Sequence, residues 1–318
     1  MDIEYLLLLQ GVRESFGGWL TTLVELVTKI PTSPLSALIP GILFWCVSRR
    51  AGLFLLAVMS FGRLINSLVK DIFCVYRPWI LDPNVHPAHK AMAKASSYSF
   101  PSGHTQFTAA IYGGLAYFYR RKFPWLIIPC ALIILLVALS RNFLGVHTPQ
   151  DVLFAILEMT VLIILADKIF DAVERDRRLG VAVFAVGTIF TAAAAFYMLT
   201  KNYPVDYLYG KIIVTPETAR LDSIDSIGVT VGFLLGWALE WRFVNFSLNV
   251  DRATKIRRVI IGCAVGGAAM ALLLVLKKLA GAAVYEFCKG FMPLFAVIFL
   301  APLAFTFVER KFRFRRLH

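Results

Sequence analysis

The chain has 318 residues, of which 58% are hydrophobic, and its mean hydropathy is +0.71. Such an apolar composition excludes an ordinary soluble protein of two domains. The formal net charge of +13 does not indicate nucleic-acid binding, because the basic residues form short clusters between apolar segments and make no basic face with interleaved aromatic residues.

The first 33 residues mix apolar side chains with charged ones such as Arg13 and Glu14. We interpret residues 1–33 as amphipathic helices that lie in the membrane interface rather than as a full span. The start of the chain is acidic, with Asp2 and Glu4, whereas a secretory signal peptide begins with basic residues. No cleavable signal peptide is therefore expected.

Nine apolar segments follow, several of them long enough to cross a hydrocarbon layer about 30 Å thick. Their approximate bounds are Pro34–Val47, Gly52–Val69, Thr105–Tyr119, Pro124–Leu139, Val152–Ile169, Val181–Leu199, Ile227–Phe243, Val259–Leu276 and Val284–Val308. The predicted fold class is all-α, a polytopic membrane helix bundle of about nine transmembrane helices. We divide it into a six-span catalytic core over residues 34–200 and three additional C-terminal spans over residues 201–318, in one continuous membrane domain.

The distribution of basic residues predicts the orientation of these spans. Alternate gaps between the segments, including the C-terminal one, hold 19 of the 33 Lys and Arg residues. By the positive-inside rule these gaps face the cytoplasm, which puts the C-terminus inside and the N-terminus outside. The stretches 70–104 and 140–151 then share the outer face with the polar stretch 201–225, which we interpret as an entrance or lid. We expect an integral protein of a bacterial plasma membrane with its active site on the outer face.

Three blocks on that face carry residues suited to chemistry. They are Lys70-x6-Arg77-Pro78, Pro101-Ser102-Gly103-His104 and Ser140-Arg141-x5-His147-x3-Asp151. A lone Lys or Arg at the end of a span is usually an interface anchor. Several charged groups that topology does not require, however, mark function. Arg offers a planar fork to phosphate oxygens and Lys a point charge, so the three cations predict an anion site.

The remaining motif residues add acid–base and nucleophilic groups. Ser102 and Gly103 precede an apolar run and are expected at a helix N-terminus, where free backbone N–H groups favour an anion. His147 and Asp151 are four residues apart, so a carboxylate can fix the imidazole tautomer and leave the other ring nitrogen nucleophilic. His104 supplies a second imidazole for proton transfer. A lone intramembrane histidine is more often a satisfied polar residue, but a chance match of all blocks in order is an event on the order of one in ten million.

The blocks resemble, at every fixed position, the signature of the type-2 phosphatidic acid phosphatase superfamily, whose members are integral membrane lipid phosphatases. The resemblance implies that His147 attacks phosphorus, that Asp151 orients it, and that His104 protonates the leaving oxygen and then activates water. It implies that the phosphate is bound by Lys70, Arg77, Ser102, Gly103 and Arg141. It also implies a reaction without a metal or another cofactor.

We therefore expect a metal-independent phosphatase that hydrolyses a lipid phosphate monoester or diphosphate through a phospho-histidine intermediate. The lipid could be phosphatidic acid, phosphatidylglycerol phosphate, a polyprenyl diphosphate or a sphingoid phosphate. The alternatives are a lipid phosphotransferase on the same scaffold and a phosphatase for a soluble sugar phosphate. A vanadium haloperoxidase is disfavoured because those enzymes are soluble, and a non-catalytic lipid transporter or scaffold because both histidines are present. The expected partners are the lipid substrate and membrane lipids, with no nucleic acid and no obligate protein partner.

Two charged residues lie outside the motifs within predicted spans. Arg63 precedes Lys70 by seven residues and Glu158 follows Asp151 by seven, so each lies about 10 Å deeper in its helix. A charged group at that depth costs roughly 2.5–3.5 kcal/mol or more and usually pairs. We predict a contact between Arg63 and Glu158, direct or through water, beneath the active site. The alternative is that each meets a different partner, such as Asn66.

Overall fold

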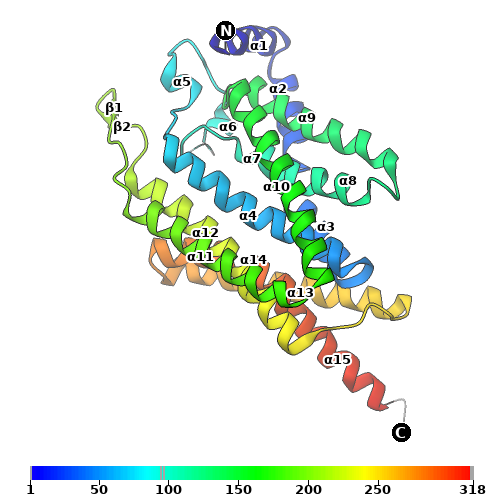
Figure 1. Ribbon diagram of the computed structural model, residues 1–318. Coiled ribbons are helices and arrows are strands. Elements are labelled where there is room, and N and C mark those ends of the chain that lie inside the picture. The colour runs from blue at the N-terminus through cyan, green and yellow to red at the C-terminus, as the bar shows by residue number, and fades with distance from the viewer. Residues whose placement is uncertain (1, 94, 96, 316–318) are drawn as a thin grey trace.

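The computed structural model describes residues 2–93, 95 and 97–315 and is helical along most of its length (Figure 1). The α-helices are α1 (Asp2–Phe16), α2 (Gly18–Lys29), α3 (Pro34–Ile42), α4 (Arg49–Phe73), α5 (Pro78–Leu81), α6 (His89–Met92), α7 (Gly103–Thr108), α8 (Gly114–Tyr119), α9 (Ile127–Phe143), α10 (Pro149–Arg175), α11 (Arg178–Thr200), α12 (Pro216–Leu239), α13 (Arg252–Leu279), α14 (Ala282–Phe295) and α15 (Ala301–Arg315). They are joined by a 3-10 turn, η3 (Pro124–Leu126), and by π-helical turns η1 (Leu43–Val47), η2 (Ala109–Gly113), η4 (Glu240–Val244) and η5 (Ala296–Leu300). The predicted all-α membrane fold class is confirmed.

Within the described residues, six helical runs are long and apolar enough to cross a membrane. They are Arg49–Leu81, Pro124–Phe143, Arg178–Thr200, Pro216–Val244, Arg252–Leu279 and Ala282–Arg310. The other predicted segments form α3 with η1, the run from α7 through η2 to α8, and α10. An integral membrane architecture follows, but the predicted number of nine spans is not confirmed.

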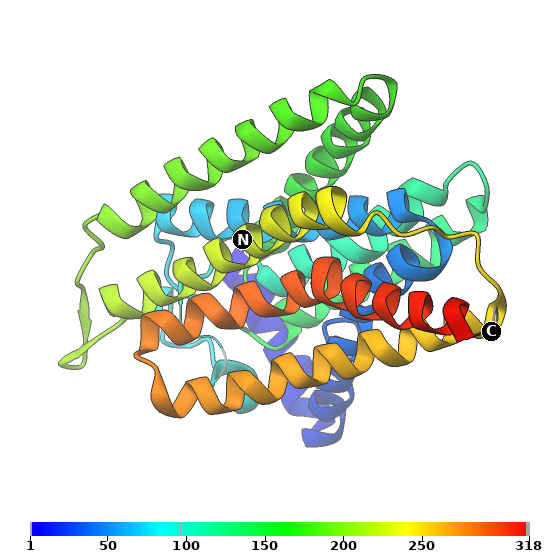
Figure 2. The ribbon, with the colours of Figure 1, turned by 90° about the horizontal axis from the view of Figure 1, so that it is seen from below.

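The helices of the C-terminal part form a layer against the rest of the bundle. In Figure 2, α11, α12, α14 with α15, and α13 lie side by side in that order. Helix α4 packs on α12 from one side and on α10 from the other. It therefore lies between this layer and the helices α7 to α10 (Figure 1).

Helix α4 is the element that delivers the first motif. Its start is capped by the Ser48 hydroxyl, which accepts a hydrogen bond from the backbone N–H of Ala51 at 3.1 Å. Near this start the helix touches the preceding segment so closely that a Cβ on Gly52 would lie 2.3 Å from the Cβ of Phe44. The helix ends at Cys74, whose backbone is left-handed with a φ of 49°. Lys70 lies in the last turn of this helix.

Helices α12 and α14 pack backbone to backbone through glycines. A Cβ on Gly290 would lie 2.1 Å from the carbonyl oxygen of Asp225, and one on Gly228 would lie 2.3 Å from that of Phe287. Small residues allow membrane helices to approach in this way, where dispersion contacts rather than the hydrophobic effect hold helices together. Side chains on α12 are thereby fixed relative to α14.

The polar stretch predicted as a loop over 201–225 is shorter than expected, because α12 already begins at Pro216. Thr215 caps that helix by accepting from the backbone N–H of Thr218 at 3.1 Å, and proline at the first position is compatible with a helix start. The remaining loop contains a two-stranded antiparallel hairpin, β1 (Tyr207–Leu208) and β2 (Lys211–Ile212).

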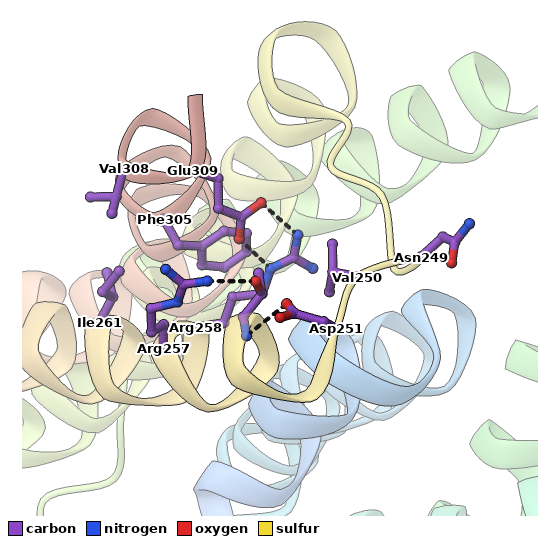
Figure 3. Close-up of a pocket in the computed structure, with 10 residues that line it drawn as sticks. Asn249, Val250, Asp251, Arg257, Arg258, Ile261, Phe305, Val308 and Glu309 are labelled. Atoms are coloured by element: carbon purple, nitrogen blue, oxygen red, sulfur yellow. Dashed lines mark hydrogen bonds and ion pairs between the residues drawn. The ribbon is translucent and has the colours of Figure 1, made fainter. Parts of the chain in front are cut away.

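An ion pair with a buried arginine lies at the opposite end of the bundle. Arg258 is 1% exposed and donates from Nε and Nη2 to both carboxylate oxygens of Glu309, at 2.7 and 2.9 Å. Its guanidinium also lies over the Phe305 ring, and together with Asp251 these residues line a cavity of about 280 Å³ (Figure 3). This cavity lies near the C-terminal end of the chain and contains none of the motif residues.

Candidate active site

The three motif blocks meet at one end of the bundle, the end that also carries α1 and the hairpin of β1 and β2 (Figure 1). The first block closes α4, the second opens α7, and the third joins α9 to α10. Hydrogen bonds between the blocks hold them together, so segments far apart in the sequence contribute to one buried cluster.

His147 lies in the short loop between α9 and α10 and is only 2% exposed. Its Nδ1 is 3.1 Å from Oδ2 of Asp151, which is also buried. The predicted pairing is made, although His147 precedes the helix instead of lying within it. An ionised carboxylate only accepts hydrogen bonds, so Nδ1 carries the proton and Nε2 carries the lone pair.

The Asp151 carboxylate is held by donors other than His147. Its Oδ2 accepts from the Ser99 hydroxyl at 2.5 Å and from the backbone N–H of Thr148 at 2.9 Å. Thr148 caps α10 in return, because its hydroxyl accepts from the backbone N–H of Asp151 at 3.4 Å. The helix start thus fixes the carboxylate that orients the imidazole.

Arg77 faces the other ring nitrogen of His147. Its Nη1 lies 2.9 Å from Nε2, and the guanidinium also donates to the carbonyls of Ser97 at 2.9 Å and Val146 at 3.0 Å. Guanidinium nitrogens are always donors, so this contact agrees with a lone pair on Nε2. A fixed cation therefore donates to the ring nitrogen that carries the lone pair, and this hydrogen bond must open before the nitrogen can attack.

The surroundings keep the His147 imidazole neutral. Burial lowers its pKa well below the ordinary value, and the positive charge of Arg77 lowers it further, against the opposing effect of Asp151. A neutral imidazole has a lone pair available for attack, whereas an imidazolium has none. The loop thus holds His147 in the form that nucleophilic chemistry requires.

Lys70 holds the loop that leads into the second motif. Its ammonium group donates to the carbonyls of Tyr98 at 3.1 Å, Ser99 at 3.3 Å and Pro101 at 2.7 Å. An ammonium has three protons, so these three contacts engage all of them. A contact of Lys70 with phosphate stays a prediction, and making it requires the exchange of at least one carbonyl.

Arg141 lies in the last turn of α9 and is 5% exposed. It interacts electrostatically with Arg77, yet its buried Nε has no hydrogen-bond partner among the described residues. Buried polar groups are nearly always paired, so an unpaired guanidinium nitrogen beside a second cation is suited to a bound anion. The next residue, Asn142, donates to the His147 carbonyl at 2.9 Å and holds the reactive loop in place.

The second motif is packed directly against the third. Ser102 is fully buried, and its backbone N–H donates to the carbonyl of Asp151 at 3.0 Å, while its hydroxyl accepts from Thr105 at 3.1 Å. Gly103 begins α7, and His104 occupies the next position in that turn. From Gly103 the chain is helical without interruption through η2 and α8.

Two contributors to this region carry no sequence pattern that would reveal them. Ser99 donates to Asp151, as described above, and Arg13 of α1 donates from Nη1 to the Phe143 carbonyl at 3.0 Å. Arg13 also donates from Nη2 to the carbonyl of His86, and it is 8% exposed. The N-terminal helix is therefore tied to the end of α9 that carries Arg141. That α1 and α2 lie in the membrane interface stays a prediction.

The predicted direct contact between Arg63 and Glu158 is not made, and a contact through water stays a prediction. Arg63 donates from Nη2 to Oδ2 of Asp225 on α12, at 2.8 Å. Glu158 instead lies close enough to Asn66 and Lys70 to interact with them, and neither of its carboxylate oxygens has a hydrogen-bond partner within the part of the chain that the structure describes. The alternative of separate partners describes the structure better, because α12 supplies a carboxylate in a place where the sequence predicted a loop.

Within residues 2–93, 95 and 97–315, no group of three or more His, Cys, Asp or Glu side chains is arranged to hold a metal ion. The positive charges that act on His147 come from Arg77 and Arg141. What this site offers chemically is a neutral imidazole, a carboxylate that orients it, and cations that suit an anionic group.

The fold and these residues define a class: a polytopic helical membrane protein with a buried site of histidine, carboxylate and arginine. The sequence model of the PAP2 superfamily matches residues 51–175. A second model, described as the transmembrane extension of PAP2 superfamily phosphatases, matches residues 224–311. The chain belongs to the PAP2 superfamily, the type-2 phosphatidic acid phosphatases that its motifs resemble.

Two curated proteins of Bacillus subtilis (strain 168) are similar to this chain. A phosphatidylglycerophosphatase B is 33% identical over 146 residues, which cover 42% of this chain and 68% of that protein. The undecaprenyl-diphosphatase BcrC is 36% identical over 93 residues, 29% of this chain and 44% of that protein. No solved structure matches the chain significantly.

Proposed function

We propose that this chain is a lipid phosphate phosphatase that transfers the phosphoryl group first to Nε2 of His147 and then to water. The observation that carries the proposal is the pair of contacts on the imidazole. Nδ1 lies 3.1 Å from Asp151, and Nε2 faces Arg77 at 2.9 Å. The nitrogen with the lone pair is thus the one beside a phosphate-binding group.

In the first step Arg77 moves its hydrogen bond from Nε2 of His147 to the bound phosphate, the Nε2 lone pair attacks phosphorus, and the bond from phosphorus to the leaving oxygen breaks. His104, in its protonated form, gives its proton to that oxygen. Arg77 and Arg141 offset the charge on the equatorial oxygens of the phosphoryl group in flight. Asp151 stabilises the positive charge that develops on the imidazole as the new bond forms.

In the second step water attacks the phospho-histidine. His104, now neutral, accepts a proton from the water, the bond between Nε2 and phosphorus breaks, and inorganic phosphate leaves. His147 and His104 thereby return to their starting protonation states. The cations supply the charge that a metal ion supplies in other phosphatases, so we propose a metal-independent reaction.

We propose a lipid phosphate monoester or diphosphate as the substrate. The site lies at the ends of membrane helices, where a phosphate reaches the cations while its tail stays in hydrocarbon. The names of the two Bacillus subtilis relatives, a phosphatidylglycerophosphatase and an undecaprenyl-diphosphatase, support this class. The distribution of basic residues supports an active site on the outer face of a bacterial plasma membrane.

The test is phosphate release by the purified protein in detergent. Phosphatidic acid, phosphatidylglycerol phosphate, a polyprenyl diphosphate, a sphingoid phosphate and a soluble sugar phosphate are compared, with and without a chelator. We expect release from at least one lipid, insensitivity to chelator, and acid-labile phosphate on the protein after a rapid quench. His147→Ala should remove both signals.

The matched control is His89→Ala, because His89 is exposed on α6 and outside the motifs. This variant should keep wild-type turnover. Activity in His147→Ala would contradict the nucleophile, and loss of activity with chelator would contradict the metal-independent reaction. Transfer of the phosphoryl group to a second lipid, without release of inorganic phosphate, would instead identify a phosphotransferase.

A further inference from the structure

Arg63 lies on α4, two helical turns before Lys70, and belongs to none of the three motifs. One end of its guanidinium, Nη2, is bound by Asp225 at 2.8 Å. The other end, Nη1, faces the second motif, because a Cβ built on Gly103 would lie 4.0 Å from it. The same Cβ would lie 3.9 Å from Oδ1 of Asn66. Arg63 therefore reaches the helix start that carries Ser102 and Gly103.

The Arg63 side chain is only partly covered by its neighbours. Its side chain is 39% exposed, whereas that of Asp225 is 11% exposed. Arg63 lies well inside a run of helix that is apolar enough to cross a membrane. Charged side chains at such a depth usually face the interior of the bundle or a water-filled space rather than lipid, and they serve function by default.

The negative charge of Asp225 is shared between two cations, Arg63 and Lys289. The ammonium of Lys289 on α14 lies 3.5 Å from Oδ1 of Asp225 and also pairs with Glu286. Asp225 thus lies between two cations, and Glu286 interacts with both Lys289 and Arg63. Asp222, a turn earlier on α12, interacts with Arg63, Lys70 and Arg77 and limits the excess of positive charge. The C-terminal layer therefore forms one wall of the proposed site.

We propose that Arg63 binds a second phosphate of the substrate, the one next to the phosphate that His147 attacks. This inference rests on the proposed function and narrows it to lipids whose headgroup carries two phosphates. Arg63 starts about 10 Å deeper along α4 than Lys70 and reaches back toward Gly103, so it meets the part of the headgroup that leads to the tail. The second phosphate comes either from a prenyl diphosphate or from the phosphodiester of phosphatidylglycerol phosphate.

The test compares Arg63→Gln with the wild type on three lipids in the same detergent. Phosphatidic acid carries one phosphate, whereas phosphatidylglycerol phosphate and a prenyl diphosphate carry two. We expect kcat/KM of the variant to fall about tenfold more on at least one two-phosphate lipid than on phosphatidic acid, the lower end of what a hydrogen bond between charged groups contributes. The lipid with the larger loss identifies the source. Equal losses on all three lipids, or no loss, would overturn the proposal.

A purely structural role of the ion pair makes a different prediction. Asp225→Asn breaks the same pair but keeps the guanidinium, so a structural role predicts that it behaves like Arg63→Gln. Our proposal predicts that Asp225→Asn keeps the preference for lipids with two phosphates. Arg63→Lys keeps the positive charge but loses the planar guanidinium group that can bind two oxygens at once. This variant should retain part of the preference for lipids with two phosphates.

A second readout does not depend on turnover of a two-phosphate lipid. Methylenediphosphonate and inorganic phosphate are compared as inhibitors of phosphatidic acid hydrolysis. Arg63→Gln should weaken inhibition by the diphosphonate and leave that by phosphate unchanged, and an unchanged ratio would contradict the second-phosphate site. If the wild type releases phosphate from none of the lipids, the proposed function itself fails.

Discussion

Arg77 and His147 are in direct contact, with Nη1 of the guanidinium 2.9 Å from Nε2 of the imidazole. The same guanidinium holds the carbonyls of Ser97 and Val146, so it links the segment before the second motif to the loop of the third. One side chain thus positions two segments and also supplies charge at the nitrogen proposed to react.

This double role predicts a large effect of Arg77→Lys. Lysine keeps the charge, but it cannot reach both carbonyls and His147 in one plane. We expect kcat/KM to fall about 100-fold or more, in the range seen when one preorganised donor to a transition state is lost. Arg121→Lys, at an exposed position on the other end of the bundle, is the control and should change nothing. Near wild-type activity of Arg77→Lys would show that charge alone is sufficient.

The buried state of His147 predicts the pH dependence. Burial and Arg77 lower the pKa of His147, so the neutral form persists below pH about 6.5, the ordinary value for histidine. The acid limb of kcat/KM that belongs to this residue should therefore lie below that pH. Arg77→Gln removes a positive charge, which raises the pKa of His147 and moves this limb to higher pH.

Asp151→Asn should shift the acid limb of kcat/KM in the direction opposite to that of Arg77→Gln. The Asp151 carboxylate raises the pKa of His147, so its removal should move the acid limb to lower pH or leave it out of range. The pH profile of the residual activity of each variant checks the prediction. Limbs that move in the same direction in both variants would contradict an assignment to His147.

Most helices and the three motif blocks could be predicted from the sequence because their signals are local, whereas the roles of the motif residues stay predictions. The spacing of His147 and Asp151 and the apolar runs between polar gaps can be read directly along the chain. Ser99 and Arg13 could not be found in this way, since their partners, Asp151 and the Phe143 carbonyl, are far away in sequence. The partner of Arg63 was missed for another reason: the helix start at Thr215 and Pro216 places Asp225 on a helix.

Ser99 is expected to act through Asp151. Its hydroxyl donates to Oδ2 at 2.5 Å, and Ser99→Ala would leave that oxygen with His147 and the Thr148 backbone as donors. We expect kcat to fall roughly 3- to 30-fold with little change in KM, since one hydrogen bond to a charged group contributes about 1.5–3 kcal/mol, of which only part acts on the transition state. Ser15→Ala, an exposed position on α1, is the control. A change in KM alone would show that Ser99 acts on substrate binding.

Arg13 is expected to hold the catalytic loop in place. It is buried and donates to carbonyls at the end of α9 and in the loop before α6, so Arg13→Ala leaves those acceptors unpaired. The expected cost is about 1–3 kcal/mol for each buried acceptor that stays unsatisfied. Thermal unfolding in detergent should show a lower midpoint for this variant, whereas its exposed neighbour Glu14→Ala should match the wild type. An unchanged midpoint would show that α1 is not needed to stabilise this region.

The contact between Asp71 and Ser223 predicts that the C-terminal layer is coupled to the catalytic helix. The Ser223 hydroxyl on α12 donates to Oδ2 of Asp71 at 2.5 Å, and Asp71 follows Lys70 directly on α4. If α12 fixes the end of α4 through this bond, Asp71→Asn and Ser223→Ala should each lower kcat, and the double variant should be no worse than the more damaged single one. A double-mutant cycle measures this, with an expected coupling of about 0.5–3 kcal/mol for residues in contact. If the losses of kcat in the two single variants add up in the double variant, the two side chains act independently. The position of the first motif at the end of α4 then does not depend on this contact with α12.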